Sequence, residues 1–394
     1  SRRRAHLGGH RRRHRSRLPR GARMIHAAVN LLWCAHGRVG GSEEYLVRQL
    51  TGLADVATDI TCELHLANRL ADAHPTLARH QLAITRLDVD RRAVRIPAEH
   101  TTLALATRGA DLVHHGGGTA PLWGRAPRVV TVHDLQYLRL PQYFSRARLT
   151  YLRAMMGQSI RRATVITTPT AHVAATVTEA FDIDPERIVV VPHGVPAAEV
   201  SDADIAESRR THLGDTDGRL VVLPAITHPH KGHLRMIAAF SRWSRADDRL
   251  VLIGGAGAAE ERVTAAISAS GIADRISRPG RVSEHERDTL IAAADIVALP
   301  SEEEGFGAPV VEAMAAGTAV VVSDIPALIE GAAHAAASAT DSENGLLEAL
   351  DEAIADRTRL ESAGRERAGR YTTEASGRAL ASAYRRAVGR EDPS

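Results

Sequence analysis

The sequence predicts an α/β protein made of two Rossmann-like domains, each a doubly wound parallel sheet, that face each other across a cleft. Three observations support this fold class. The chain of 394 residues is too long for one ordinary core and suits two domains of somewhat under 200 residues each. Short β-branched runs alternate with longer helical stretches, and they form two series. A segment rich in small and polar residues separates the series.

The two series of strand-like runs define the domains, predicted at residues 24–196 and 197–372. The first series holds MIHAAVNLL from Met24, RVVTVHD from Arg128, ATVITT from Ala163 and RIVVVP from Arg187. The second holds RLVVLP from Arg219, RLVLIGG from Arg249, DIVALP from Asp295 and AVVVS from Ala319. Ligands of such sheets bind beyond the carboxyl ends of the strands, so paired domains are expected to bind one in the cleft between them.

Two segments connect or follow these domains. PHGVPAAEVSDADIAES, from Pro192, is the predicted linker, with the boundary near residue 197. Residues 373–394 are expected to hold a last helix, at roughly Thr373 to Val388.

Residues 1–23 form a basic tail that is predicted to be disordered. The tail contains ten arginines and no acidic residue, and the net charge of +3 minus these ten charges leaves −7 for the remainder. It has no apolar periodicity from which to build a core. One interpretation is a basic arm for anionic lipid or nucleic acid, and the other is a non-structural leader with Met24 as the natural start.

Composition excludes several classes of protein. The tail has no apolar core of the kind a secretory signal needs, and no run reaches the roughly 18 apolar residues of a membrane span, so we expect a cytoplasmic protein. Aromatic residues make up 3% of the chain, which argues against single-stranded nucleic acid as a partner. The two cysteines, Cys34 and Cys62, lack metal-ligand spacing and are predicted to be reduced core residues.

The segment SEEEGFGAPVVEAMAAGTAVVVSD, from Ser301, says most about function. A buried strand is predicted to end before it, and Pro309 is placed as the first residue of a helix, so Glu304 is expected on a loop and Glu312 in the helix's first turn. Glycines let the loop approach a ligand, and free N–H groups at a helix start favour an anion or a polyhydroxyl group. A carboxylate accepts two hydrogen bonds from neighbouring hydroxyls. The pair therefore suits two sugar-like rings joined by phosphates, as in a nucleotide sugar.

This segment resembles the E-x7-E signature of glycosyltransferase family 4, retaining enzymes of the GT-B fold. The residues in family register are Pro300, Ser301, Glu304, Gly305, Phe306, Gly307, Pro309, Glu312, Ala313, Met314, Ala315, Gly317, Ser323 and Asp324. The resemblance implies a hexosyltransferase, for example a mannosyltransferase, that moves a sugar from a nucleoside diphosphate sugar to an acceptor hydroxyl. It places the donor on the C-terminal domain and the acceptor on the N-terminal domain, with the last helix crossing back to the latter.

The resemblance also assigns roles to individual residues. Lys231 lies at a strand-to-helix turn, where a lysine can meet a diphosphate as a point charge, and its implied role is to neutralise the leaving diphosphate. Many family members have an arginine where this chain has Ile226, and His228, His230 or an arginine from elsewhere is left to replace it. Glu304 is implied to contact the transferred sugar and Glu312 the ribose.

Further donor contacts are expected in both domains. Gly40 and Gly41 precede a helix predicted near Ser42, and their place after the first strand matches the family's phosphate-facing loop. Gly305, Phe306 and Gly307 form the loop between the two glutamates.

The end of the strand RVVTVHD has the cleft edge as its predicted place. His133 ends a strand there and is implied to lie near the donor sugar and the reaction centre, although a lone histidine is more often structural. Val282 falls where the family's backbone contacts the nucleobase. His115 and the three glycines after it close another strand, and either line the acceptor side or form a flexible turn.

No cofactor is expected. The cleft segments hold no Asp-x-Asp motif or His/Cys cluster, so the prediction is a metal-independent enzyme. The expected partners are the nucleotide-sugar donor and a glycan or lipid-linked acceptor, such as a cell-envelope polysaccharide precursor, with no nucleic acid. Peripheral association with the inner face of a membrane is a further expectation. The alternatives are a nucleotide-sugar epimerase or a non-catalytic nucleotide-sugar binding protein on the same fold.

Overall fold

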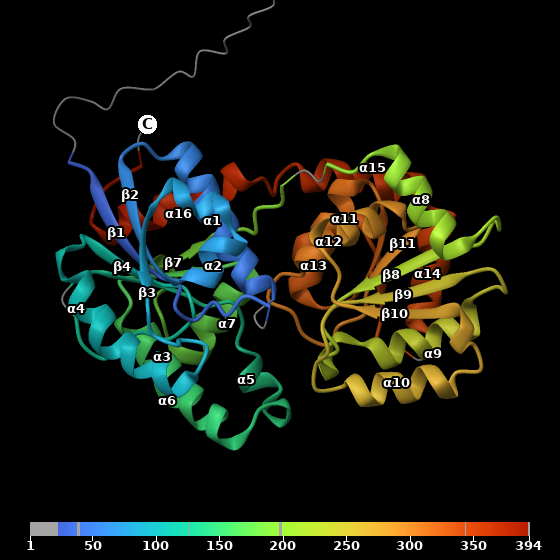
Figure 1. Ribbon diagram of the computed structural model, residues 1–394, viewed down its shortest axis with the longest axis horizontal. Coiled ribbons are helices and arrows are strands. Elements are labelled where there is room, and N and C mark those ends of the chain that lie inside the picture. Colours follow the sequence, from blue (N-terminus) through green and yellow to red (C-terminus); the bar gives the residue numbers. More distant parts are fainter. Residues whose placement is uncertain (1–22, 38–39, 125, 197–198, 343, 393–394) are drawn as a thin grey trace, which may run out of the picture.

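The computed structural model describes residues 23–37, 40–124, 126–196, 199–342 and 344–392, which form two α/β lobes side by side (Figure 1). Each lobe has a parallel sheet with helices on both faces, which confirms the predicted fold class. The predicted tail lies outside the described residues except for Arg23, and so does residue 197, near which the domain boundary is predicted.

The N-terminal lobe is built on a seven-stranded sheet with the order β3-β2-β1-β4-β5-β6-β7. Its strands are β1 (Ile25–Asn30), β2 (Ile60–Ala67), β3 (Gln81–Thr85), β4 (Leu112–His115), β5 (Arg128–Thr131), β6 (Val165–Thr168) and β7 (Ile188–Val190). Its helices are α1 (Gly41–Val56), α2 (Asn68–Ala73), α3 (Arg92–Ala98), α4 (Ala104–Ala106), α5 (Gln136–Arg139), α6 (Arg146–Arg162) and α7 (Ala171–Phe181). The strand order reverses between β1 and β4.

The C-terminal lobe has a six-stranded sheet with the order β10-β9-β8-β11-β12-β13. Its strands are β8 (Leu220–Pro224), β9 (Arg249–Ile253), β10 (Ile276–Gly280), β11 (Ile296–Leu299), β12 (Ala319–Ser323) and β13 (Ala337–Ala339). Its helices are α8 (Asp202–Leu213), α9 (His233–Trp243), α10 (Glu260–Ala269), α11 (Glu284–Ala293), α12 (Ala308–Ala316), α13 (Pro326–Ala332), α14 (Gly345–Ala355) and α15 (Arg357–Ala368). Here the order reverses between β8 and β11.

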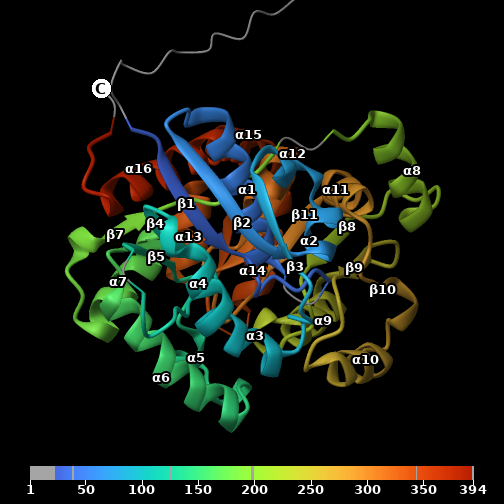
Figure 2. The same cartoon turned by 60° about the vertical axis from the view of Figure 1, so that its left-hand side comes forward.

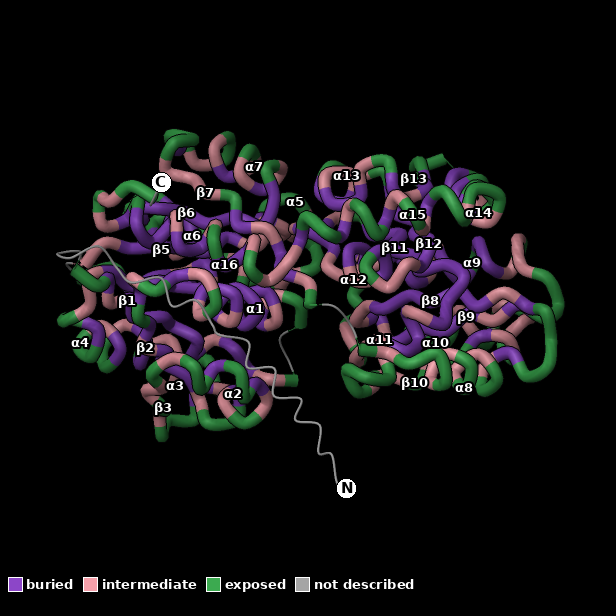
Figure 3. The backbone as a smooth tube through the Cα atoms, turned by 90° about the horizontal axis from the view of Figure 1, so that it is seen from above, coloured by how far each residue is buried: buried purple, intermediate pink, exposed green. Residues whose placement is uncertain are grey.

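Apolar side chains fill both faces of each sheet. The buried backbone runs through the middle of each lobe and exposed backbone surrounds it (Figure 3). In the C-terminal lobe, alternate residues of β8 supply opposite faces: Leu220 and Val222 pack towards α11 and α12, whereas Val221 and Leu223 pack towards α9 and α14. Strands buried on both faces explain why the sequence shows continuous apolar runs rather than alternation.

The last helix, α16 (Thr373–Ala387), packs in the N-terminal lobe, beside α1 and against the sheet (Figure 2). The Thr372 hydroxyl accepts the Ala375 N–H and so starts the helix. On its buried face the Tyr384 hydroxyl lies 2.8 Å from Nδ1 of His114 on β4. Arg385 forms an ion pair with Asp59, 2.6 Å between Nη2 and Oδ1. The C-terminal segment therefore joins the two lobes.

Glycines allow α1 and α16 to cross at backbone contact. A Cβ atom added at Gly52 would lie 1.9 Å from the carbonyl oxygen of Thr373, and one at Gly377 would lie 2.2 Å from the Gly52 carbonyl carbon. A side chain at either position would force the two helices apart.

Gly52→Ala should therefore destabilise the protein by about 1–3 kcal/mol, the usual cost of overpacking. Gly331→Ala is the matched control, because this helical glycine in α13 has its nearest neighbour, the Phe306 carbonyl oxygen, at 3.5 Å. The control should be neutral or slightly stabilising, since alanine has the higher helix propensity. Urea denaturation compares the two. Equal midpoints would contradict the tight crossing.

Three details differ from or add to the sequence predictions. The predicted linker contains the start of α8, where Ser201 and Asp204 form a capping box, so its last residues, from Asp202, are helical. Cys34 and Cys62 are both free and buried, as expected. Among the described residues no helix has the length and apolar character needed to cross a bilayer.

Candidate functional site

The loops that follow β8 and β11 bring Lys231 and Glu304 together. These strands are neighbours at the point where the strand order reverses, which is where doubly wound sheets bind ligands. The Lys231 ammonium donates to Oε1 of Glu304 at 2.7 Å, and the Ser301 hydroxyl donates to the same oxygen at 2.8 Å. The Lys231 side chain is 21% exposed and that of Glu304 is 8% exposed. Two of the three predicted catalytic residues, Lys231 and Glu304, therefore form one partly buried ion pair, and the third is His133.

Lys231 is also the only lysine in the chain, since every other member of the 50 lysines and arginines is an arginine. Lysine carries its positive charge on a compact, strongly hydrated ammonium group, whereas arginine spreads the same charge over a planar guanidinium. The presence of a single lysine in the chain is a sequence signal for Lys231 that is independent of the family motif.

The loop with Gly305 contacts the N-terminal lobe directly. A Cβ atom at Gly305 would lie 2.2 Å from the carbonyl oxygen of His133, and the Thr170 hydroxyl donates to the Gly305 carbonyl at 3.0 Å. Close backbone approach therefore accounts for this glycine. Gly307 has φ +81° and caps α12, a left-handed conformation that glycine adopts without strain.

Phe306, between these glycines, points into the protein. The residue is 6% exposed, and its ring stacks on His193 with ring centroids 5.2 Å apart. Its ring also contacts Tyr371 edge-on at 5.4 Å. The structure thus gives Phe306 packing contacts on both sides.

Glu312 lies in α12 and faces the other lobe. It is the fifth residue of α12, because Ala308 rather than Pro309 is the first, so the predicted place in the first turn is wrong by one residue. Nη1 of Arg48, on α1, donates to Oε1 of Glu312 at 2.8 Å, and the side chains are 8% and 13% exposed. Burial alone would raise the pKa of Glu312, but Arg48 and Arg287 bring it below its ordinary value. Glu312 is therefore held ionised.

The two glutamates of the motif thus have different partners. Glu304 binds the C-terminal lobe's own Lys231 and Ser301, whereas Glu312 forms an ion pair across the lobes. Sequence reasoning missed Arg48, because its spacing from Glu44 resembles an ordinary surface pair of helix charges.

His133 follows β5 at the inner edge of the N-terminal lobe. Its Nε2–H donates to the Gly116 carbonyl at 2.8 Å, and its ring lies between Trp33 and Tyr45 at 5.5 and 5.4 Å. Burial lowers the pKa of His133 to about 4, so the ring is neutral near pH 7. The neutral tautomer has its lone pair on Nδ1.

Asp134, next to His133, adds another carboxyl group near Lys231. Burial raises the pKa of Asp134, while the charge of Lys231 lowers it and that of Glu304 raises it. Glu303 behaves similarly: burial raises its pKa, and Arg139, 3.2 Å away across the lobes, lowers it. Lys231 therefore lies among several carboxyl groups.

The glycine pair after β1 meets the loop after β8. Gly40 precedes α1, which begins at Gly41, and a Cβ atom on Gly40 would lie 3.4 Å from Cδ1 of Ile226. The first turn of α1 also holds Glu43 and Glu44, so this helix start has two carboxylates beside its free N–H groups. Val282 is half-buried before α11 and packs against the C-terminal core.

Neither of the two candidate histidines supplies the positive charge of the arginine that many family members have at the position of Ile226. Burial and then Lys231 lower the pKa of His228 and that of His230, the latter to about 4, so both rings are neutral near pH 7. Arg148 on α6 is a cation whose charge lowers the pKa of His228 and of Asp134. A positive charge therefore reaches this region from the N-terminal lobe.

A cavity of about 580 Å³ lies elsewhere, in the N-terminal lobe between α4 and the segment before β5. It is lined by His115, Trp123 and Arg128, among others, and by none of the residues just described. His115 therefore faces this cavity rather than the loops around Lys231.

Two family models match the chain in succession. The model described as Glycosyltransferase Family 4 matches residues 39–199, and the model described as Glycosyl transferases group 1 matches residues 204–374.

Several curated glycosyltransferases are similar to the chain. The 2-deoxystreptamine N-acetyl-D-glucosaminyltransferase of Streptomyces fradiae is 30% identical over 315 residues, 71% of this chain and 72% of that protein. The D-inositol 3-phosphate glycosyltransferase of Segniliparus rotundus is 30% identical over 244 residues, 59% of this chain and 54% of that protein. The O-antigen chain mannosyltransferase RfbU of Salmonella typhimurium is 26% identical, over 52% of this chain and 54% of that protein. The matches span about half the length of the latter two proteins.

Solved structures share the fold. Anabaena Alr3699/HepE in complex with UDP-glucose has a TM-score of 0.73 at 20% identity, covering 91% of this chain and 98% of that one. WaaG, a glycosyltransferase involved in lipopolysaccharide biosynthesis, has a TM-score of 0.66 at 18% identity, covering 87% of this chain and 95% of that one. Taken with the family models, these likenesses show that the chain belongs to glycosyltransferase family 4 and is a glycosyltransferase enzyme of the GT-B fold.

Proposed function

We propose that this glycosyltransferase moves a hexose-type sugar from a nucleoside diphosphate sugar to an acceptor hydroxyl of a glycan, glycolipid or cell-envelope polysaccharide precursor, with retention of configuration. The observation that carries the proposal is the Lys231–Glu304 ion pair at the point where the strand order of the C-terminal sheet reverses. This position is where a parallel sheet binds its ligand. The pair offers one cation for phosphate and one acceptor for sugar hydroxyls.

In this proposal each residue has one task. Lys231 stays beside Glu304, directs its remaining N–H donors to the diphosphate and stabilises the negative charge that develops as the sugar leaves. Glu304 then binds hydroxyls of the transferred sugar, and Glu312 binds the ribose. Such charge stabilisation acts strongly in a site prepared in advance. His133, neutral and fixed by Gly116, faces the reaction centre as a hydrogen-bond acceptor through Nδ1.

The proposal also covers the backbone contacts with the donor, the independence from a metal ion and the location of the enzyme. Gly40, Gly41 and the backbone at Val282 contact the diphosphate and the base. Lys231 carries the charge that a metal ion would otherwise supply, so transfer proceeds without a divalent cation at the diphosphate. We place the enzyme in the cytoplasm, peripherally at the inner face of a membrane when its acceptor is lipid-linked.

A donor screen tests the proposal. HepE was solved with UDP-glucose, and a relative in Xanthomonas campestris is named for GDP-mannose, so UDP and GDP sugars come first. A ligand at a hundred times its dissociation constant stabilises by about 2.7 kcal/mol, which a thermal shift detects. Product analysis with and without acceptor follows. A new glycosidic bond supports transfer, isomerised donor means an epimerase, and tight binding without turnover means a binding protein.

The single lysine gives a direct prediction. A nucleoside diphosphate bound at Lys231 should protect it from an amine-selective acylating reagent, with labelling followed by peptide mass spectrometry. Arg210→Lys supplies a matched control, because Arg210 is 63% exposed on α8 and its replacement should be labelled equally with and without nucleotide. Unchanged labelling of Lys231 at saturating nucleotide would place the diphosphate elsewhere.

A further inference from the structure

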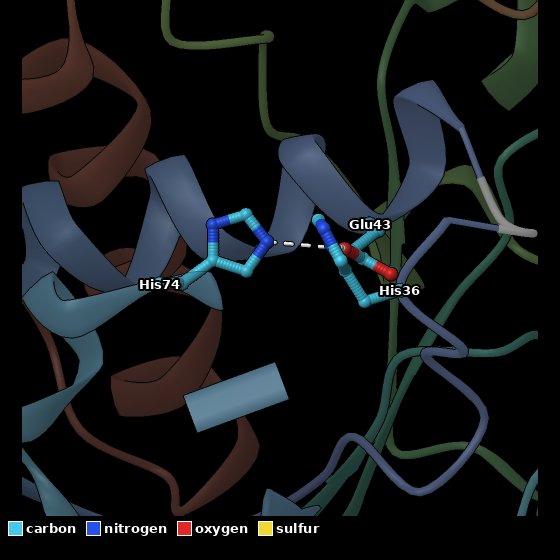
Figure 4. A group of neighbouring side chains, drawn as sticks. All are labelled: His36, Glu43 and His74. Carbon is cyan, nitrogen blue, oxygen red and sulfur yellow. Dashed lines mark hydrogen bonds and ion pairs between the residues drawn. The ribbon is translucent and has the colours of Figure 1, made fainter. Parts of the chain in front are cut away.

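Three side chains of the N-terminal lobe converge outside the transfer site. His36 follows β1, Glu43 lies in the first turn of α1, and His74 connects α2 to the 3-10 turn Pro75–Arg79 (Figure 4). Nδ1 of His36 lies 2.8 Å from Oε1 of Glu43, and Nε2 of His74 lies 3.0 Å from the same oxygen. One donor atom from each residue lies within 4.8 Å of the other two, and among the described residues this is the group of histidine, cysteine and carboxylate side chains that meets this spacing.

The cluster leaves a buried carboxylate oxygen without a partner. The Glu43 side chain is 3% exposed, and its Oε2 has no hydrogen-bond partner within the described part of the chain. Both imidazoles lie within hydrogen-bond distance of the other carboxylate oxygen, Oε1. A buried polar atom without a partner is costly, and native proteins nearly always satisfy one. A cation between the three side chains would satisfy it.

We propose that His36, Glu43 and His74 bind a divalent transition-metal ion of the Zn²⁺ type. Two imidazole nitrogens and one carboxylate oxygen are a donor set that Zn²⁺ accepts, whereas Mg²⁺ and Ca²⁺ prefer oxygen ligands alone. Zn²⁺ binds such atoms at about 2.0–2.1 Å, so tetrahedral ligands lie about 3.3 Å apart. The two N–O spacings of 2.8 and 3.0 Å need a small expansion, and the two histidine nitrogens already lie within 4.8 Å of each other. Water takes the fourth position.

A second group of two histidines and one glutamate lacks the close spacing of donor atoms that the first group has. Glu63 lies between His26 and His65, with Nε2 to carboxylate oxygen distances of 3.9 and 3.1 Å, but these three do not meet the spacing of a shared ion. His26 lies on β1 and is half-buried, with its side chain 39% exposed. It serves as the control position.

The alternative to a metal ion in this cluster is a proton on His74. Burial lowers the pKa of His74, while Glu43, Glu44 and Glu284 raise it, and the net shift is upwards. A protonated His74 would form an ion pair with Glu43 and leave Oε2 as it is. Metal binding must displace that proton, so its affinity should fall as the pH falls.

The proposed metal site lies beside Gly40 and Gly41 and contains neither Lys231 nor Glu304. His36 and Glu43 flank the segment with Gly40 and Gly41, whereas Lys231 and Glu304 belong to the other lobe. A metal ion would attach both ends of this segment to the α2 region. The inference does not depend on the proposed transfer reaction, because metal binding is measured without any donor.

Calorimetric titration of the chelator-treated full chain with ZnCl₂ tests the proposal. We expect one ion per chain at micromolar affinity or tighter, unaffected by millimolar MgCl₂. His36→Ala and His74→Ala should each weaken binding more than a hundredfold, and His26→Ala should leave it unchanged. Titration with CoCl₂ should give visible absorption bands of a tetrahedral centre, again lost in the His36 and His74 variants.

The His36→Ala variant is expected to fold normally, because the His36 side chain is 34% exposed and its replacement disturbs packing least. Weaker metal binding in this variant therefore reports loss of a ligand and not loss of the fold. Absence of saturable binding at one ion per chain would overturn the proposal. So would wild-type affinity in a folded His36→Ala protein, since the ion would then lie elsewhere. Either result would leave the cluster as a hydrogen-bonded ion pair only.

Discussion

Lys231→Ala should lower kcat by about a hundredfold or more, the scale on which removal of one electrostatic donor acts. The charge of Lys231 is proposed to stabilise the diphosphate as it leaves, and among the described residues near Glu304 no second lysine or protonated histidine can take its place. Steady-state kinetics with the donor found by the screen measures the effect. Near-normal kcat would show that another group supplies the charge.

The structure adds a stability cost to this variant. Without Lys231, the 8% exposed carboxylate of Glu304 keeps only the Ser301 hydroxyl, and an unpaired buried charge is destabilising. The double variant Lys231→Ala/Glu304→Gln removes that charge. It should regain thermal stability relative to Lys231→Ala while remaining inactive. A double variant with restored turnover would attribute the loss to folding rather than to catalysis.

Glu304→Gln should lower kcat by a similar factor, because its carboxylate is proposed to bind the reacting sugar and to hold Lys231. An interaction made chiefly with the transferred group affects turnover more than binding of the rest of the donor. Glu303→Gln is the matched control. It changes the adjacent carboxylate, which pairs with Arg139 instead, and should alter kcat by less than tenfold. Equal losses in the two variants would mean that charge near the loop matters and not the Glu304 contact.

The sequence predicted the parts of this site that rest on local chemistry. Strand runs such as residues 219–224 and 295–300 are continuous and apolar because both sheet faces are covered. Their loops therefore place Lys231 and Glu304 at adjacent strand ends. Their contact follows from strand order, which the doubly wound pattern implies.

Tertiary contacts explain what the sequence did not predict. Arg48 and Arg287 reach Glu312 from separate helices, and no spacing rule links residues so far apart in the chain. The His36–Glu43–His74 cluster has the same cause, since its members come from a loop, a helix and a connection. The helix start at Ala308 rather than Pro309 reflects the left-handed Gly307 before it, because proline suits either of the first helical positions.

The Arg48–Glu312 pair sharpens the division between the two glutamates. Ribose hydroxyls that bind Glu312 must share it with Arg48 or displace Arg48. Arg48→Gln removes the competitor and keeps the carboxylate, so it should not weaken nucleotide binding. This variant controls for disturbance between the lobes.

Calorimetry with bare UDP and GDP on Glu304→Gln and Glu312→Gln tests the central claim most directly. Glu312→Gln should weaken binding of the nucleoside diphosphate by roughly tenfold to a hundredfold, the range of one hydrogen bond to a charged group. Glu304→Gln should leave that affinity within about twofold, because the bare nucleotide lacks the sugar that Glu304 is proposed to bind. An equal loss in both variants, or a larger one in Glu304→Gln, would contradict the proposed roles.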